Sequence, residues 1–399
     1  MVDDGTVNAS ADPGRTSALR SASVRITRLT LTSFRNYGRA SLDFHADGAA
    51  LLGDNGHGKT NLLEAIYYLE LFRSARGARD RDLVRFGDAG FHVSATLEGS
   101  PRGALSISAG FDASTQKKKV MLDAVEVPRL SDAIGAAPAV LFSPADVALV
   151  RGAPAERRRY LDVMLALADR QYLLALQQYR HALAQRNAAL RSLMGHARDA
   201  EALDAVAAFE PALATAGATM LVKRHAWAAD AATAYSEVLD AIGERTSVSL
   251  ALKRGGGPRT DETELAEWLR TTFATQRLHD VKRGTTHTGP HRDEVQLLLD
   301  GRDLRNFGSN GQQRSAAIAL RMLEARTLHT ALGTAPLLLM DDPFAELDAD
   351  RSARILGLLS RRGLGQVVLA VPRSEDIPRA LTGLQTVRVH QGTLAPDVA

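Results

Sequence analysis

The segment Gly53-Asp54-Asn55-Gly56-His57-Gly58-Lys59-Thr60 matches the pattern G-x-x-x-x-G-K-[ST]. Glycines at these spacings let successive backbone N–H groups turn inward around phosphate oxygens. Lys59 adds positive charge at the β- and γ-phosphates, and the Thr60 hydroxyl can ligate Mg²⁺. The apolar run at 49–52 predicts a strand before the segment, and residues 61–72 predict a helix after it. This setting predicts a nucleotide-binding phosphate loop formed by all eight residues.

A pair of carboxylates follows a second apolar run, far along the chain. Residues 337–342 read Leu-Leu-Leu-Met-Asp-Asp, which predicts a strand that ends in Asp341 and Asp342. Acidic residues after a strand are usually just solvated, but an upstream phosphate loop favours a nucleotide role. We expect Asp341 to hold Mg²⁺ opposite Thr60, and Asp342 to orient or deprotonate the attacking water. The candidate catalytic residues are therefore Asp342 and Lys59.

A second anion site is predicted where Ser309-Asn310-Gly311-Gln312-Gln313 opens a helix. The phosphate loop already surrounds the γ-phosphate of its own nucleotide. We therefore expect Ser309, Gly311 and Gln312 to bind the nucleotide of a second copy of the chain. Glu346-Leu347-Asp348 follows the carboxylate pair, where ABC proteins carry a loop that touches the partner subunit. Four motifs in this order resemble the ABC superfamily and predict an ATP-dependent homodimer.

Strand-like and helix-like segments alternate at both ends of the chain, whereas its middle is helical. Residues 24–44 alternate apolar and polar positions about a turn at 36–38, which predicts a hairpin. Pro211 predicts that the second of two middle helices is kinked or begins late. With a loop at 195–200, these helices form either an antiparallel hairpin or two ordinary core helices. Their apolar stripe consists of Leu176, Tyr179, Leu183, Arg186, Leu190 and Leu193, and then of Leu213, Met220, Trp227, Ala231 and Val238.

We therefore expect an α/β fold, an ABC-type P-loop ATPase head that is split by an inserted antiparallel helical arm. The expected segments are a disordered tail at 1–23, the N-terminal part of the head at 24–140, the helical arm at 141–249 and the C-terminal part of the head at 250–399. Two such chains would close head to tail over two ATP molecules.

The amino-acid composition restricts the cellular compartment and the kinds of chemistry that we expect. The chain has no cysteine, which excludes disulfides, thiolate metal sites and cysteine nucleophiles and agrees with a reducing cytoplasm. No run of eighteen apolar residues occurs, so no transmembrane helix and no membrane partner are expected. The eleven histidines show no paired metal-ligand spacing. The net charge is only +3, so any nucleic-acid surface has to be a local one.

Two arginine-rich segments are candidates for contact with DNA. Arg73, Arg76 and Arg79 lie close together in the sequence, and Arg157 and Arg158 belong to a run of three arginines. Each cluster alone is more typical of a solvated face. Aromatic residues make up only 5% of the chain and form no run, which favours contacts to the phosphate backbone over stacking on bases.

From residue 24 to about 378 the chain resembles the bacterial RecF family. The resemblance is carried by Phe34-Arg35-Asn36-Tyr37, by the phosphate loop, and by the stretches FRSARGARDRDLVRFG (72–87), LFSPADVALVRGAPAERRRYLD (141–162), QRN (185–187), GPHRDE (289–294), FGSNGQQRSAAIALR (307–321) and LLLMDDPFAELDADR (337–351). It implies a dimer that ATP closes on single-stranded or gapped DNA. It also implies a role in recombinational repair, replication restart and SOS induction, with RecO and RecR as partners in RecA loading. Within GPHRDE, His291 and Arg292 contact nucleotide or DNA, or form a structural ion pair.

The chain departs from that family after its last core strand, where Ala370-Val371-Pro372 replaces the usual polar switch residue. No glutamine corresponds to the ABC Q-loop, and the turn at 143–146 stands in its place. Asp342 stands where fast ABC ATPases carry glutamate, which predicts slow hydrolysis that acts as a switch. The alternatives are an SMC-like chromosome-maintenance head, which would need a longer coiled coil, and a transporter ATPase subunit, which would need a membrane partner.

Overall fold

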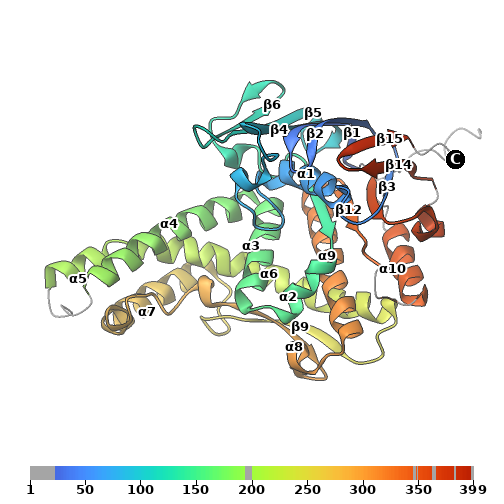
Figure 1. Cartoon of the computed structure of the whole chain (residues 1–399). Helices are drawn as coiled ribbons and strands as arrows, with labels where there is room; N and C mark the ends of the chain where they lie inside the picture. Colours follow the sequence, from blue (N-terminus) through green and yellow to red (C-terminus); the bar gives the residue numbers. More distant parts are fainter. Residues whose placement is uncertain are drawn as a thin grey trace, which may run out of the picture.

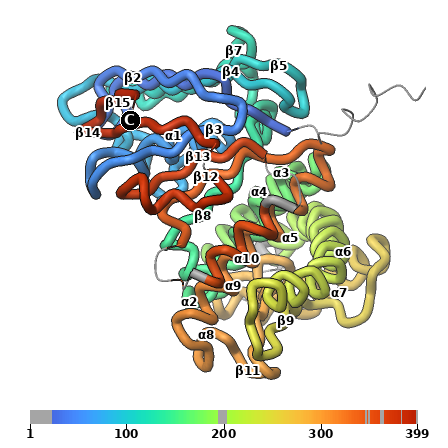
Figure 2. Tube along the Cα trace, turned by 90° about the vertical axis from the view of Figure 1, so that its right-hand side faces the viewer, coloured from blue at the N-terminus to red at the C-terminus, as the bar shows by residue number. Residues whose placement is uncertain are grey.

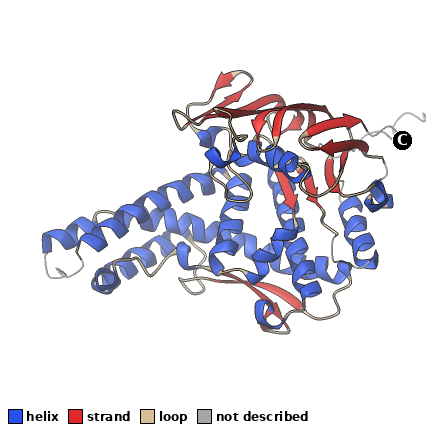
Figure 3. Cartoon of the chain, viewed as in Figure 1, coloured by secondary structure: helices blue, strands red, loops and turns tan. Residues whose placement is uncertain are grey.

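The computed structural model describes residues 23–193, 200–344, 347, 349–361, 365–381 and 383–396. Three expectations fall mainly outside these residues: the disordered tail, most of the loop at 195–200, and Glu346 and Asp348 of the segment that follows the carboxylate pair. Figure 3 shows the strands gathered mainly at one end of the molecule and the long helices at the other.

An antiparallel sheet forms the outer layer of the strand-rich end (Figure 1). Its order is β2-β1-β4-β5-β6-β7, with β1 (Arg25–Phe34), β2 (Tyr37–Asp43), β4 (Gly90–Ser100), β5 (Gly103–Asp112), β6 (Lys117–Leu122) and β7 (Val125–Glu126). The predicted hairpin is confirmed, because β1 pairs with β2 from Arg28 with Asp43 to Phe34 with Tyr37. Its turn lies slightly earlier than predicted, at Arg35 and Asn36.

A second, mostly parallel sheet carries the predicted nucleotide motifs. Its order is β15-β14-β3-β13-β12-β8, with β3 (Gly48–Leu52), β8 (Ala139–Phe142), β12 (Leu337–Asp341), β13 (Val367–Val371), β14 (Gln385–His390) and β15 (Thr393–Pro396). Strands β8, β12, β13, β3 and β14 run parallel. The first four are nearly continuous apolar runs because both of their faces are covered, whereas β14 alternates polar and apolar residues. Helix α1 (Lys59–Leu71) packs between this sheet and the antiparallel one, in a shared core. The chain leaves the sheet after β8 and returns at β12, so the head is split as predicted.

The helical end contains both predicted stripe helices, α4 (Arg170–Ser192) and α6 (Glu210–Ile242), which pack against each other. All the predicted stripe residues are buried except Leu183, which is half-buried. Pro211 lies in the first turn of α6, so the alternative in which the helix begins late is confirmed. A further helix, α7 (Glu262–Arg283), packs along α6, and Figure 2 shows the two side by side. The two stripe helices therefore belong to a larger helical lobe, and their inner parts share a core with the head.

The remaining elements connect the helical lobe to the head. Helix α3 (Pro154–Ala168) contacts α4 and α9 (Asn310–Leu332), and α9 in turn packs on α6. The others are α2 (Ala148–Arg151), α5 (Ala200–Ala207), α8 (Leu304–Phe307), α10 (Ala349–Arg361) and a small antiparallel sheet of β9 (Val248–Lys253), β10 (Glu294–Leu299) and β11 (Arg302–Asp303).

Among the described residues, one helical stretch, Leu203–Ile242, is long and apolar enough to cross a membrane by length and composition alone. Half of its most apolar window is buried inside the protein, and α6 packs on α4, α7 and α9. Because a buried core helix passes the same test, packing within the fold accounts for this stretch.

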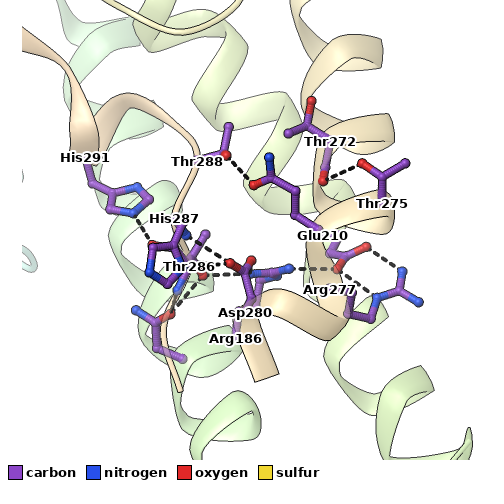
Figure 4. A network of polar contacts seen from close by, with 12 residues as sticks. Arg186, Glu210, Thr272, Thr275, Arg277, Asp280, Thr286, His287, Thr288 and His291 are labelled. Carbon is purple, nitrogen blue, oxygen red and sulfur yellow. Dashed lines mark hydrogen bonds and ion pairs between the residues drawn. The ribbon is translucent and has the colours of Figure 1, made fainter. Parts of the chain in front are cut away.

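A buried network of charges ties the outer parts of α4, α6 and α7 together (Figure 4). Arg186, the one charged member of the predicted stripe, is fully buried and donates to Asp280 (2.8 Å), Glu210 (3.1 Å) and the Thr286 hydroxyl (2.7 Å). Asp280 also accepts from the ring Nδ1 of His287 at 3.0 Å. With His279, these two residues place three potential metal ligands within 4.8 Å, a grouping that the sequence spacing did not reveal. Both Asp280 oxygens are already hydrogen-bonded, which favours a structural ion-pair cluster over a metal site. Within the described residues, the buried Nε of Arg186 has no hydrogen-bond partner.

Candidate nucleotide site

The phosphate loop lies between β3 and α1, as predicted. Two of its glycines are sterically required. A Cβ atom on Gly53 would lie 2.3 Å from the carbonyl oxygen of Val389, and one on Gly58 would lie 2.6 Å from Asn36 Nδ2. Both residues have positive φ angles, 150° and 117°, that side chains disfavour. The loop is therefore held close to neighbouring strands with its backbone turned as the sequence pattern requires.

Two residues of the β1–β2 turn brace the loop from outside. Asn36 Nδ2 donates to the carbonyl oxygen of His57 at 2.9 Å, and the Tyr37 hydroxyl donates to that of Gly58 at 2.9 Å. Asn61 Nδ2 in turn donates to Asn36 Oδ1 at 2.8 Å. The sequence predicted this turn as part of a hairpin but gave no sign of its bracing role, which depends on a tertiary contact.

A cavity of about 220 Å³ opens at the loop. It is lined by Asn55, Gly56, Gly58, Lys59, Thr60, Asn61, Arg76, Asp341, Asp342, Ala370 and Pro372. The loop and the carboxylate pair are thus brought together as expected. His57 is placed differently, because its ring packs edge-on against His390 with the centroids 4.6 Å apart. Ala370 and Pro372 contribute no polar side chain, in agreement with the departure that the sequence shows at this strand.

The residues at the cavity floor fit a magnesium nucleotide. Thr60 Oγ1 donates to Asp341 Oδ1 at 2.9 Å, which places a hydroxyl and a carboxylate together as Mg²⁺ requires. Burial raises the pKa of Asp341, opposed first by the hydrogen bond from Thr60. Asp342 has a φ of 44°, and its N–H donates to the carbonyl oxygen of Ala370 at 3.0 Å. The backbone of Asp342 is therefore fixed by β13 beside the metal-binding position.

Lys59 is largely buried and bends back over its own loop. Its ammonium donates to the carbonyl oxygens of Gly53 and Asp54, the latter at 3.0 Å. Burial lowers the pKa of Lys59, while Asp341, Asp342 and Asp54 act in the opposite direction. An arriving phosphate would add negative charge and favour the protonated ammonium further.

Arg76 belongs to this cavity, whereas the sequence analysis assigned it to DNA. Its side chain is 47% exposed, and its Nη1 lies 4.0 Å from Glu64 Oε2 and 3.5 Å from Asn61 Oδ1. Its charge also lowers the pKa of Asp341. The neighbouring Arg35 makes a paired contact with Glu64, at 3.0 and 3.1 Å. Arg76 is therefore a second cation beside Lys59, positioned by the buried carboxylate of α1.

The predicted signature caps a helix at another place in the fold. Ser309 Oγ accepts from the N–H of Gln312 at 3.2 Å, and Gln312 Oε1 accepts from the N–H of Ser309 at 2.9 Å, which closes a capping box at the start of α9. Gln312 Nε2 donates to Glu244 and Thr246, both at 3.3 Å. The Gln312 side chain therefore serves the structure of its own chain. Among the described residues, Ser309, Gly311 and Gln312 are all absent from the lining of the nucleotide cavity.

The structure corrects the candidate DNA set at Arg157. This side chain is only 5% exposed and donates to the carbonyl oxygen of Val295 at 2.7 Å. It also forms an ion pair with Glu294 at 3.1 Å. Its position on the inner face of α3 makes it a structural residue. Arg73 and Arg79 are exposed, and Arg158 is half-buried.

In the described residues, His291 has a structural role through hydrogen bonds and not through the ion pair that the sequence analysis offered as one alternative. Its Nε2 donates to the carbonyl oxygen of Thr286 at 3.0 Å, and its Nδ1 accepts from the buried Tyr179 hydroxyl at 2.6 Å. Burial lowers the pKa of His291 to about 4, so the ring is neutral near pH 7. Arg292 donates to the same Thr286 oxygen at 2.8 Å.

A parallel sheet with a phosphate loop, a paired carboxylate strand and a helical insertion between them defines an ATPase head of the ABC and SMC type. Residues 25–394 match the model of the RecF/RecN/SMC N-terminal domain. The chain belongs to this family and, within it, to the RecF DNA replication and repair proteins.

Relatives in two bacteria carry this assignment at the sequence level. The DNA replication and repair protein RecF of Lacticaseibacillus casei is 35% identical over 93% of this chain and 100% of its own length. That of Roseiflexus castenholzii is 36% identical over 93% of this chain and 99% of its own length.

Solved structures agree with the sequence relatives. The recombination mediator protein RecF of the RecFOR pathway, in its ATP form, superimposes with a TM-score of 0.85 at 26% identity, covering 95% of this chain and 99% of that one. An Smc head domain of Pyrococcus furiosus gives a TM-score of 0.54 at 16% identity, which shows a shared fold. The predicted fold class is therefore confirmed.

Proposed function

We propose that the protein is an ATP-dependent DNA-binding protein of recombinational repair, replication restart and SOS induction, and that ATP closes it into a dimer. The main observation in support of a dimer is the composition of the nucleotide cavity. The phosphate loop and both carboxylates line this cavity, while Ser309 and Gly311 lie outside the cavity, at the start of α9. A helix N-terminus with a serine and a glycine is suited to phosphate. A second chain arranged head to tail would bring it to the open side of the cavity.

Each composite site would combine Lys59, Thr60, Asp341 and Asp342 of one chain with Ser309 and Gly311 of the other. Bound Mg²⁺·ATP supplies the scissile phosphoanhydride and a cation for its oxygens. Lys59 and Thr60 bind and orient the phosphates, and Asp341 holds the position of the metal. Asp342 accepts a proton from the attacking water, with a side chain one methylene shorter than glutamate. Hydrolysis is therefore slow, and it acts as the release step of a switch.

The relatives support the proposed partners, and the DNA target is part of the proposal. The RecF structure of the RecFOR pathway matches 95% of this chain, which supports RecO and RecR as partners. Single-stranded or gapped DNA in the cytoplasm is the proposed target, with support for RecA loading as the outcome. In the described part of the helical lobe, the longest single helix is α6 with 33 residues, which favours this role over that of a chromosome-maintenance head with a long coiled coil.

Light scattering with and without Mg²⁺·ATP tests the proposal. We expect a monomer without nucleotide and a dimer with it, and ATP should also raise the affinity for gapped DNA. Ser309→Arg should abolish dimer formation but keep ATP binding, because its position lies outside the cavity of its own chain. Arg305→Gln, which changes an exposed residue on α8 nearby, serves as the control. A mass that neither nucleotide nor Ser309→Arg alters would refute the composite site.

A further inference from the structure

A second cavity, of about 240 Å³, is lined mainly by residues of α3, α4 and α6. Figure 1 shows these three helices near one another below the strand-rich end. Its wall includes Arg158, Arg159, Arg180 and Arg224. A neighbouring hollow of about 130 Å³ shares Arg159 and adds Arg73. The two hollows share Arg159 in their walls, and we call them, with these five arginines, the arginine cleft.

Positive charge exceeds negative charge along this cleft. The wall of the larger cavity carries four arginines but only one carboxylate, Asp162. One of these arginines, Arg224, is fully buried and is also paired with Asp293 at 2.7 Å, so the excess charge comes from the other three. Asp162 already accepts from Arg224 at 2.6 Å, from Arg180 at 3.0 Å and from the Tyr172 hydroxyl at 2.6 Å. Because His291 is neutral near pH 7, it adds no charge to the wall. Glu156 and Glu324 line the smaller hollow, and Glu324 is paired with Arg321.

Among the described residues, two arginines of the cleft have no acidic side chain paired with them. Within the described part of the chain, the guanidinium groups of Arg73 and Arg159 make neither an ion pair nor a hydrogen bond, and both residues are exposed. Burial lowers the pKa of Arg73 first, and the like charges of Arg159 and Arg180 lower it further. Cations held together from three different segments repel one another unless an anion binds between them.

The shape of the cleft indicates which anion binds. A compact ion needs one pocket, whereas two neighbouring hollows that share Arg159 and carry arginines in both walls suit a chain of phosphates. Tyr179 is buried and hydrogen-bonded to His291, so it offers no face on which a base could stack. We propose that the arginine cleft binds the phosphate backbone of DNA, an inference that rests on the proposed DNA-binding function. In this proposal, Arg159 and Arg180 take the place of Arg157 and Arg76 among the candidate DNA-binding residues.

The cleft is also connected to the nucleotide cavity through a very short segment. Arg73 lies at the cleft, and Arg76 lines the nucleotide cavity. Between them the buried Ser74 donates its hydroxyl to Glu64 of α1 and accepts from the N–H of Arg76 at 3.1 Å. A shift of Arg76 toward bound phosphates would therefore be transmitted to Arg73. This link gives ATP a direct route to the affinity of the cleft for DNA.

The test compares two variants that lose the same charge. The first changes Arg73, Arg159 and Arg180 to Gln. The control changes Arg25, Arg28 and Arg270 to Gln, which are exposed residues in surface ion pairs of β1 and α7. Binding of Mg²⁺·ATP-loaded protein to gapped duplex DNA is measured by fluorescence anisotropy over a salt series, together with ATP affinity and dimer mass.

We expect the cleft variant to keep ATP binding and dimer mass, and to lose about 0.9 from the log–log salt slope for each duplex phosphate contact removed. The control should keep most of the wild-type slope. If the wild type binds DNA and the two variants have equal slopes, the cleft is not the DNA site, although the proposed function stands. If the wild type with ATP binds no DNA, both fail. Loss of tripolyphosphate binding with unchanged DNA binding would identify a small-anion site instead and overturn the inference.

Discussion

Arg186→Met should destabilise the helical lobe strongly, although the new side chain suits an apolar stripe. Arg186 is fully buried and donates to Asp280, Glu210 and Thr286. Its removal leaves two buried carboxylates with one cation fewer. Breaking a buried ion pair from one side typically costs about 3–5 kcal/mol. Glu210 keeps Arg277 at 2.7 Å and Asp280 keeps its bond from His287, so we expect the lower end, about 3 kcal/mol.

Urea unfolding of both the wild type and the variant, followed by far-UV circular dichroism, measures this difference. Arg270→Met is the control, because Arg270 forms an exposed pair with Glu267 and should change stability by about 0–1 kcal/mol. A double variant that adds Asp280→Asn should cost less than the sum of the two single changes. A loss below about 1 kcal/mol for Arg186→Met would show that the network does not hold α4 to α7.

Three further predictions concern the nucleotide site and pH. Asp342→Asn should bind ATP and dimerise but hydrolyse ATP roughly 10²–10⁴-fold more slowly. Asp341→Asn should instead weaken Mg²⁺-dependent ATP binding itself. An unchanged hydrolysis rate for Asp342→Asn would show that another residue is the general base. Arg76→Gln should weaken ATP binding, measured by calorimetry, and equal affinity would return Arg76 to the DNA set. Burial lowers the pKa of His291 in the folded protein to about 4, below its value in the unfolded chain. Between about pH 6.5 and 4 the unfolded chain therefore binds more protons than the folded one. As the pH is lowered through that window, the free energy of unfolding should fall by roughly 3 kcal/mol. Thermal melts of His291→Gln should show a smaller loss over the same range, and an identical acid dependence would contradict the assignment.

The sequence predicted best those features that contiguous residues determine. The phosphate loop and the Asp341-Asp342 pair each occupy one short segment, so their spacing alone restricts their chemistry. The buried stripe was also predictable, including Arg186, because helical periodicity depends on local geometry. The head could be assembled from its two ends because the strand motifs lie there.

Contacts between distant segments could not be predicted in the same way. Arg76 and Arg157 look alike in the sequence, yet one lines the nucleotide cavity and the other is buried on α3. The bracing of the phosphate loop by Asn36, and the packing of α7 on α6, likewise depend on tertiary structure. No periodic pattern in the sequence shows whether such a side chain contacts another segment of the chain or faces solvent.

The 2.9 Å hydrogen bond between Thr60 and Asp341 spans 281 residues of sequence. During synthesis at about 5–20 residues per second, the phosphate loop would leave the ribosome roughly 14–56 s before the carboxylate that completes its metal site. A nascent or truncated chain that ends in the helical lobe has therefore made its glycine loop but has no finished nucleotide site. The nucleotide cavity is therefore complete only when nearly the whole chain has been translated, so incomplete products lack the site on which the proposed ATP-dependent function rests.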